Sequence, residues 1–327
     1  MEKVFIQGIK ANDHRILSRA ITRIENDDYV DEKRFIELYD QTQGAIRLGI
    51  TGPPGAGKST ITNELIKRFL KKNQTIGVIA IDPSSPFSGG ALLGDRVRMN
   101  HYINDKSVFI RSMGTHGNLG GLARKSQEAG DVLAASGKEI IIFETVGVGQ
   151  GEYDIAKAAD LTILVLVPES GDEIQLMKAG LLEIADLFVI NKSDREGADR
   201  LADTLNSMIN AVGSKSNLVA PVYTTVASQG KGMDKLFDGI FNHLEKLDRY
   251  GLLEKKKKER YRNRVKKLIQ EKLLGEFWTE DRIRKLEDAT NSLDTITESP
   301  YSTSNNILKS FQSLMMMIPI RCHSLNI

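Results

Sequence analysis

Residues 52–60 read Gly52-Pro53-Pro54-Gly55-Ala56-Gly57-Lys58-Ser59-Thr60 and match the pattern G-x-x-x-x-G-K-[ST] of a phosphate-binding loop. The mostly apolar run 46–50 before the loop has the composition of a β-strand. After the loop, Ile61, Leu65 and Phe69 recur at helical spacing. The motif requires a strand, a glycine-rich loop and a helix in this order, so we predict a nucleotide-binding α/β fold.

The residue types of this loop suit it to phosphate chemistry. Glycines allow a tight turn that brings backbone N–H groups close to phosphate oxygens. The helix after the loop directs its positive dipole end at the same anion. Lys58 can reach the β- and γ-phosphates, and the Ser59 hydroxyl can bind Mg²⁺. We predict that all nine residues bind nucleotide and that Lys58 is also catalytic.

Further strands alternate with helices downstream of the loop. The candidate strands are 46–51, 75–82, 107–112, 139–145, 161–167, 186–191 and 219–226, and helices are expected between them, for example at 121–136, 172–185 and 198–212. Several strands are continuous apolar runs, as parallel strands buried on both faces are. The pattern predicts a P-loop NTPase with a doubly wound, mostly parallel sheet and its ligand at the carboxyl ends of the strands.

Helical, more polar segments flank this region. We expect an N-terminal helical extension at 1–44, a nucleotide-binding domain at 45–245 on which that extension packs, and a C-terminal helical region at 246–327. The basic run 255–260 could be a surface for RNA or anionic lipid, but the solvated face of a long helix is favoured, because Val265, Leu268 and Ile269 come directly after it. The apolar segment 314–318 is expected to pack in a core or a subunit interface.

Composition limits the class of protein. The chain has 327 residues, of which 40% are hydrophobic, and its net charge of +2 gives no case for a nucleic-acid partner. The single cysteine, Cys322, excludes an intramolecular disulfide. No secretory signal is visible at Met1–Lys10 and no apolar run reaches the roughly 18 residues of a membrane span. The expectation is a cytoplasmic protein without a membrane partner.

The segment Asn191-Lys192-Ser193-Asp194 comes after an apolar run and has the form N-K-x-D. A carboxylate at Asp194 can accept hydrogen bonds from N1–H and the 2-amino group of guanine. Adenine offers an acceptor at N1 and no 2-amino group, and a site built around such polar pairs rejects the wrong base strongly. Asn191 would support the loop and the base edge, and the Lys192 stem would cover the ring, so guanine is the predicted base.

A third segment is expected to contact the base through its main chain. Val226-Ala227-Ser228 ends the last predicted strand, where guanine-binding proteins often have Ser-Ala. Val226 replaces that serine, so only a backbone contact to guanine O6 is expected of these three residues.

The segment Glu144-Thr145-Val146-Gly147 has the shape of the D-x-x-G element. In that element the acid holds the Mg²⁺ shell and the glycine N–H meets the γ-phosphate. We therefore predict that Glu144 and Gly147 are catalytic. No glutamine stands directly after Gly147 to orient water, so intrinsic hydrolysis is expected to be slow, below about 1 s⁻¹.

Two more acids complete the candidate metal site. Asp82 ends the second predicted strand, and Asp95 comes after a glycine-rich link. The predicted Mg²⁺ ligands are Ser59, Asp82, Asp95 and Glu144. Arg96 or Arg98 could act as an arginine near the phosphates, but a surface position is favoured for each.

Together these motifs resemble the MeaB/ArgK GTPases, the methylmalonyl-CoA mutase-associated G proteins within the class of metal- and cofactor-delivery GTPases. The string Glu144-Thr145-Val146-Gly147-Val148-Gly149-Gln150 is the most specific part of the resemblance, which runs from the N-terminal helices to about Leu308. Gly151 departs from the serine of many members, and 312–327 match nothing in the family.

The resemblance implies a GTP-hydrolysing chaperone of an adenosylcobalamin-dependent acyl-CoA mutase, which gates cofactor loading and protects the mutase. Methylmalonyl-CoA mutase is the first expectation for the partner, and isobutyryl-type mutases remain open. GTP or GDP and Mg²⁺ are the implied ligands. The resemblance also implies a homodimer formed through the C-terminal helical arm, and a segment at 168–175 that relays the nucleotide state to the mutase.

Two other functions are weighed against this one. A kinase linked to amino-acid transport, an older label in the family, would need an acceptor site and an aspartate base, and no separate base motif is visible. A nickel metallochaperone usually needs Cys or His clusters, whereas this chain has five His and one Cys with no C-x-x-C or His-rich tract.

Overall fold

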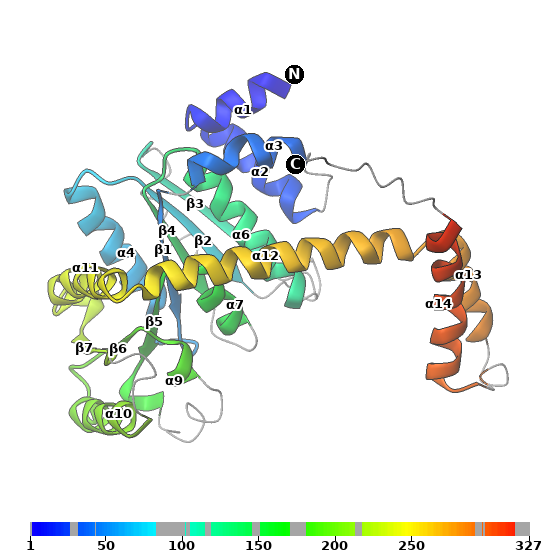
Figure 1. The fold of residues 1–327 in the computed structure, drawn as a ribbon. Coiled ribbons are helices and arrows are strands. Elements are labelled where there is room, and N and C mark those ends of the chain that lie inside the picture. Colours follow the sequence, from blue (N-terminus) through cyan, green and yellow to red (C-terminus); the bar gives the residue numbers. More distant parts are fainter. Residues whose placement is uncertain are drawn as a thin grey trace. The chain divides into compact units, whose positions relative to one another are not determined.

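The computed structural model describes residues 2–26, 32–42, 44–82, 102, 105–114, 119–145, 151–170, 181–212, 218–291, 296 and 298–317 (Figure 1). The chain divides into two compact units, Met1–Arg260 and Tyr261–Ile327. Among the described residues, no helix combines the length and the apolar character needed to cross a membrane.

A seven-stranded parallel sheet forms the centre of the first unit. Its strands are β1 (Ile46–Thr51), β2 (Ile76–Asp82), β3 (Val108–Gly114), β4 (Ile140–Thr145), β5 (Leu161–Leu166), β6 (Leu187–Asn191) and β7 (Val222–Thr225). They lie in the order β3-β2-β4-β1-β5-β6-β7. All seven predicted strands are present, and the doubly wound α/β prediction is confirmed.

The strand order gathers the predicted site at one edge of the sheet. β1 lies between β4 and β5, so the loop after β1 emerges at the centre. Ile50 of β1 is the register partner of Glu144 on β4, and Asn191 of β6 is the partner of Thr225 on β7. In a parallel sheet these carboxyl ends all meet at the same edge, where ligands of open α/β sheets bind.

Helices cover both faces of the sheet (Figure 1). On one face α4 (Lys58–Lys71) and α11 (Met233–Arg249) form a core with Ile140 and Ile142 of β4. Their contact includes Phe69 and Phe237, whose ring centroids are 5.0 Å apart. Because side chains alternate along a strand, Ile141 and Phe143 face the opposite way.

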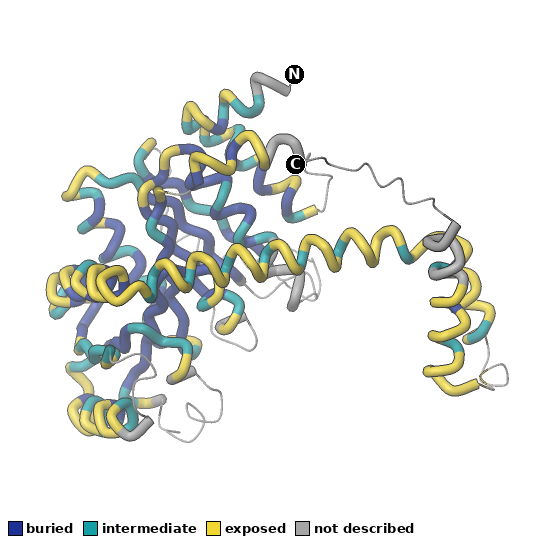
Figure 2. Tube along the Cα trace, in the orientation of Figure 1, coloured by how far each residue is buried: buried dark blue, intermediate teal, exposed yellow. Residues whose placement is uncertain are grey.

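The opposite face is covered by α6 (Leu119–Ala135), α7 (Gly151–Ala158) and α10 (Ala198–Val212). The short elements η3 (Pro168–Ser170), α9 (Leu181–Ile184) and η4 (Ala227–Gln229) complete the described connections. Of the helix expected at 172–185, residues 172–180 lie outside the described residues. Figure 2 shows the strands buried between the two helical layers.

The N-terminal segment is helical and packs on the sheet domain. It consists of α1 (Glu2–Lys10), α2 (His14–Glu25), α3 (Glu32–Tyr39) and η1 (Asp40–Thr42). Asp13 caps α2, because its carboxylate accepts hydrogen bonds from the backbone N–H groups of Arg15 and Ile16 at 2.8 and 3.2 Å. Leu17 and Ile21 of α2 are fully buried in the core that also contains α6.

The helix α12 (Leu252–Phe277) contains the basic run and has no buried residue. Most of the run is solvated, as expected, but two members are bound to the sheet domain. Lys256 Nζ lies 2.6 Å from both carboxylate oxygens of Asp186, just before β6. Arg260 Nη1 donates to Asp160 Oδ1 at 2.8 Å, just before β5. The first turns of α12 are therefore anchored beneath the amino ends of two strands.

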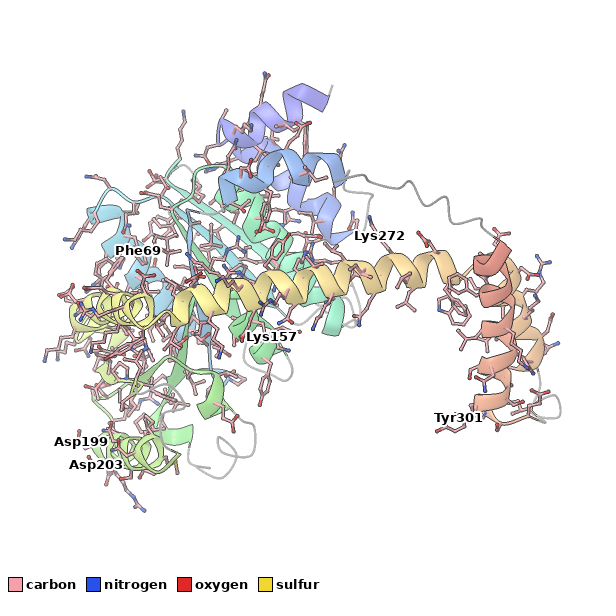
Figure 3. All side chains as sticks on the ribbon, in the orientation of Figure 1. Phe69, Lys157, Asp199, Asp203, Lys272 and Tyr301 are labelled. Carbon is pink, nitrogen blue, oxygen red and sulfur yellow. The ribbon has the colours of Figure 1, made fainter. Side chains whose placement is uncertain are left out.

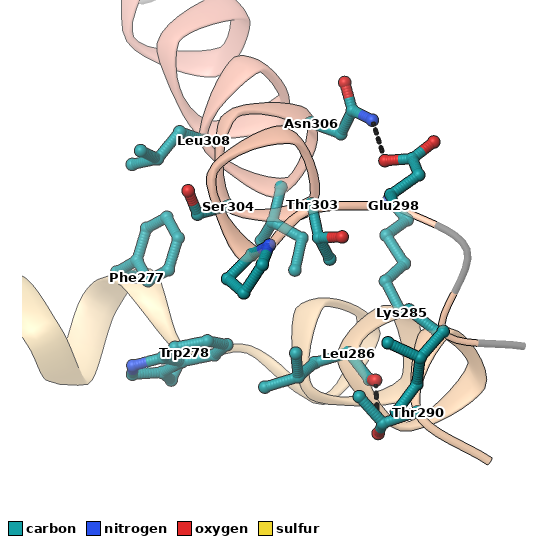
Figure 4. A pocket seen from close by; sticks show the side chains of 14 residues that line it. Phe277, Trp278, Lys285, Leu286, Thr290, Glu298, Thr303, Ser304, Asn306 and Leu308 are labelled. Atoms are coloured by element: carbon teal, nitrogen blue, oxygen red, sulfur yellow. Dashed lines mark hydrogen bonds between the residues drawn. The ribbon is translucent and has the colours of Figure 1, made fainter. Parts of the chain in front are cut away.

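The second unit contains α13 (Glu280–Ala289) and α14 (Pro300–Met317). The Arg282 guanidinium lies over the rings of Phe277 and Phe311, 5.2 and 5.0 Å from their centroids. A cavity of about 830 Å³ lies beside Trp278 and Leu286 (Figure 4). The predicted packing of 314–318 concerns side chains outside the described residues.

Candidate nucleotide site

The phosphate-binding loop has a backbone shape that only glycine accommodates at two positions. Gly52 has φ +140°, and a Cβ there would lie 2.0 Å from the carbonyl oxygen of Val165. Gly57 has φ +88°, and a Cβ there would lie 2.3 Å from Asn191 Nδ2. Any side chain at either position would displace β5 or the N-K-x-D segment.

Lys58 extends back over this loop rather than into solvent. Its Nζ donates to the carbonyl oxygens of Gly52 at 2.8 Å and Pro53 at 2.9 Å, and the residue is buried. The ammonium group therefore lies against the loop in which phosphate is predicted to bind, at the start of α4. The helix dipole adds positive potential at the same point.

Two hydroxyl groups of α4 hold the Glu144 carboxylate. Ser59 Oγ donates to Glu144 Oε1 at 2.6 Å, and Thr62 Oγ1 donates to Glu144 Oε2 at 2.7 Å. A neighbouring bond joins the strand ends, because Thr145 Oγ1 donates to Thr51 Oγ1 at 3.0 Å. The carboxylate at the end of β4 is thus fixed beside the hydroxyl of the residue after Lys58.

The donor set at this point fits Mg²⁺. Hydroxyl and carboxylate oxygens are hard ligands of the kind Mg²⁺ prefers, and the ion is usually held by a few protein oxygens together with phosphates and water. Within the described ranges, no group of three or more His, Cys, Asp and Glu side chains could hold a metal ion by itself.

Asn191 connects the predicted base loop to the phosphate loop. Its Nδ2 donates to the carbonyl oxygen of Ala56 at 2.8 Å. Its Oδ1 accepts from Thr225 Oγ1 and from the Ala227 N–H, both at 3.1 Å. The side chain is buried, and one amide thereby joins the ends of β6 and β7 to residues 52–60.

The rest of the base loop presents its acid to solvent. Lys192 adopts φ +55°, and Asp194 is exposed. The Ser193 N–H donates to the carbonyl oxygen of Thr225 at 3.0 Å and holds the turn against β7. The next residue, Arg195, forms an ion pair with Glu169 of η3, and this hydrogen bond lowers the pKa of the Glu169 carboxyl.

The main-chain N–H groups after β7 bond within the protein. The Val226 N–H donates to the carbonyl oxygen of Lys231 at 3.0 Å, and the Ala227 N–H donates to Asn191. Ser228 is exposed. A contact of these three residues with guanine remains a prediction.

Several predicted site residues fall outside the described part of the chain. They are Asp95, Arg96, Arg98, Gly147 and the segment 171–175, and for Asp82 the backbone is described but the side chain is not. Conversely, the sequence motifs did not include Thr62. A usable signal existed: Thr62 is a polar residue three positions after Ser59, and it shares a helix face with the apolar Ile66 and Phe69.

Comparison with known proteins agrees with a nucleotide-binding site. A family model described as methylmalonyl-CoA mutase-associated GTPase MeaB matches residues 17–282. A Pyrococcus abyssi protein bearing a GTPase name is 45% identical over 307 residues, which cover 93% of this chain and 95% of that one. The mouse mitochondrial methylmalonic aciduria type A homolog is 36% identical over 272 residues, covering 82% of this chain and 66% of that one.

A solved structure shares the fold. The crystal structure of an LAO/AO transport system kinase superposes with a TM-score of 0.67 and covers 95% of this chain and 97% of its own. The two sequences are 24% identical, so this match bears on architecture alone.

Proposed function

The chain belongs to the MeaB family of methylmalonyl-CoA mutase-associated GTPases, and from that premise we propose that it hydrolyses GTP to GDP and phosphate as the regulatory partner of an adenosylcobalamin-dependent acyl-CoA mutase. Methylmalonyl-CoA mutase is the first candidate, because the family description names it. The proposed role is to gate cofactor loading and to protect the mutase.

The hydrogen bonds of the Asn191 side chain are the observation that supports guanine nucleotide binding. Its amide bonds at once to Ala56 in the phosphate loop and to Ala227 beside the base loop. Base recognition and phosphate binding thus share one rigid connection. A nucleotide with the wrong base would lose contacts at Asp194 that the phosphate loop cannot replace.

Within this proposal each part of the site has a role. Residues 52–60 bind the phosphates, Lys58 contacts the β- and γ-phosphates, and Asp194 reads guanine. Ser59 and Glu144 hold Mg²⁺, with Asp82 and Asp95 as the further acids. When bound, the ion neutralises charge that develops on the phosphates.

Slow turnover is part of the proposal. The residue after Gly147 is Val148, so the chain has no glutamine directly after that glycine to orient the attacking water. A GTPase that binds its substrate well but positions water poorly is suited to regulation by a partner, because the partner can complete the site. We therefore propose that the mutase accelerates hydrolysis.

The helices from residue 246 onward are proposed to form a dimerisation arm. Tyr261, Val265, Leu268 and Ile269 are exposed apolar residues of α12. On an ideal helix these positions fall on one side. An apolar stripe of exposed side chains supports pairing with a second copy of the chain.

The kinase alternative is not favoured. The matching family model and the Pyrococcus relative are described as GTPases, and the mouse relative is described as a methylmalonic aciduria type A homolog. The kinase name comes from a structure too distant in sequence to inform on activity.

The test is phosphate release from GTP by the purified protein, alone and with the cobalamin-dependent mutase from the same cell, with ATP as the control substrate. We expect GTP-specific turnover below about 1 s⁻¹ that rises when the mutase is added. Lys58→Met should abolish turnover in both conditions. Turnover that the mutase leaves unchanged would contradict the proposed partnership, and equal turnover of ATP would contradict the proposed base specificity.

A further inference from the structure

We propose that Thr62 is a positioning residue of the metal site: it holds the Glu144 carboxylate so that this group accepts the hydrogen of Ser59 and directs the Ser59 oxygen toward Mg²⁺. This inference rests on the proposed function and assigns a role to a residue outside the phosphate-loop, D-x-x-G and N-K-x-D motifs.

Helix geometry puts the two hydroxyls on one side of α4. Ser59 and Thr62 are three residues apart, and residues at this spacing are neighbours on a helix surface. Glu144 points toward the same helix, because it alternates along β4 with Phe143 and shares the face of Ile142. The carboxylate therefore reaches both hydroxyls, at 2.6 and 2.7 Å.

The direction of each hydrogen bond is set by the chemistry. A carboxylate only accepts hydrogen bonds, so both hydroxyls donate to it. A serine that gives its hydrogen to a carboxylate presents the lone pairs of its oxygen elsewhere, which is the state a metal ion requires of a hydroxyl ligand. Glu144 thus sets the orientation of Ser59.

Thr62 in turn sets the orientation of Glu144. Its hydroxyl binds the second carboxylate oxygen, and it is fully buried, while Glu144 is 2% exposed. Loss of this bond would weaken the hold on that oxygen and allow the carboxylate to turn away from Ser59. Outer partners of this type typically alter metal affinity by about 10- to 100-fold when they are removed.

The chain offers a matched control for this bond. Thr162 of β5 is also fully buried, but its hydroxyl has no hydrogen-bond partner among the described residues. Thr162→Val and Thr62→Val make the same chemical change at the same degree of burial. Only Thr62→Val removes a hydrogen bond to the predicted metal site.

The experiment measures GDP affinity with a fluorescent GDP analogue, in Mg²⁺ and in EDTA, for the wild type, Thr62→Val, Thr62→Ser and Thr162→Val. For Thr62→Val, we expect the ratio of the GDP affinity in Mg²⁺ to the GDP affinity in EDTA to fall by about tenfold or more. The GDP affinity in EDTA should change by less than about twofold. Thr62→Ser keeps a hydroxyl and should restore most of the Mg²⁺ effect. Thr162→Val should match the wild type.

Two results would overturn the inference while leaving the proposed function intact. One is an unchanged Mg²⁺ effect in Thr62→Val. The other is an equal loss of affinity in Mg²⁺ and in EDTA, which would assign Thr62 a purely structural role. A wild-type protein without Mg²⁺-dependent GDP binding would overturn the proposed function as well.

Discussion

At the scale of single residues, Lys138 is the least expected feature of the protein. It lies between α6 and β4, outside the motifs recognised in the sequence, and it is only 2% exposed. Its Nζ donates to the carbonyl oxygen of Lys106 at 2.7 Å. Burial lowers the pKa of this amine from 10.5 to about 8, although Asp105 opposes the shift.

This shift predicts a specific pH dependence of stability. Between about pH 8 and pH 10.5 the folded amine is neutral while the unfolded amine still binds a proton, so unfolding takes up a proton and the free energy of unfolding rises with pH. The full effect is about 3 kcal/mol. Lys138→Met should lack it, so urea unfolding from pH 7 to pH 10.5 should show the wild type gaining stability relative to the variant. Parallel curves would contradict the prediction.

Asp194 supplies a prediction about base recognition. Asp194→Asn replaces an acceptor pair with a mixed donor and acceptor, so one contact to guanine is lost and a charge-assisted bond is weakened. Such bonds contribute about 1.5–3 kcal/mol, so we expect the dissociation constant for GDP to rise by about tenfold or more.

The control for Asp194→Asn is Asp199→Asn, the same change at an exposed position near the start of α10 (Figure 3). It should leave GDP affinity unchanged in a calorimetric titration. Equal affinities for the wild type and Asp194→Asn would remove Asp194 from the base site.

At the scale of elements, the sequence predicted the strands well and the anchoring of α12 poorly. Continuous apolar runs such as 161–167 have few alternatives to a buried parallel strand, and the loop at 52–60 carries its own structural context. The contacts of Lys256 and Arg260 depend on acids that precede β5 and β6, far away in the sequence. Nothing in a run of lysines distinguishes the two cations that bind acids of the sheet domain from the other members of the run.

In the candidate site, too, some residues could be predicted from the local sequence and others only from the folded structure. The motif residues were identifiable because each motif is local. Thr62 was missed because its function depends on Glu144, which reaches it only after β1 and β4 pair. Likewise, the amide of Asn191 could be assigned to a base loop from its motif, but its bond to Ala56 required the folded sheet.

The anchor of α12 predicts unequal effects of two similar changes. Arg260 pairs with Asp160, and the two side chains are 16% and 2% exposed. In Arg260→Met the buried Asp160 carboxylate keeps the hydrogen bond from the Arg47 backbone N–H but loses its cation. The free energy of unfolding should therefore fall by about 3 kcal/mol.

The comparison is Lys258→Met, which breaks the Lys258–Glu254 pair in the same helix. Those side chains are 62% and 68% exposed, and ion pairs this exposed contribute little to stability because solvent screens them. Urea unfolding at neutral pH measures both variants. Equal losses would show that Asp160 does not need Arg260.

At the scale of the whole molecule, the exposed apolar residues of α12 predict a homodimer. Val265→Glu combined with Leu268→Glu introduces two charges into the stripe and should convert the dimer to a monomer in light scattering. Gln270→Glu adds a charge on the opposite side of the helix and should leave the dimer intact. A wild-type protein that is monomeric at high concentration would contradict the proposed arm.

The central claim is that one connected site binds a guanine nucleotide together with Mg²⁺. Calorimetric titration of the wild-type protein with GDP and with ADP, each in Mg²⁺, tests it most directly. The connection through Asn191 and the acid at Asp194 predict saturable binding of GDP and none of ADP in the same concentration range. Equal binding of the two nucleotides, or no binding of GDP, would contradict the claim.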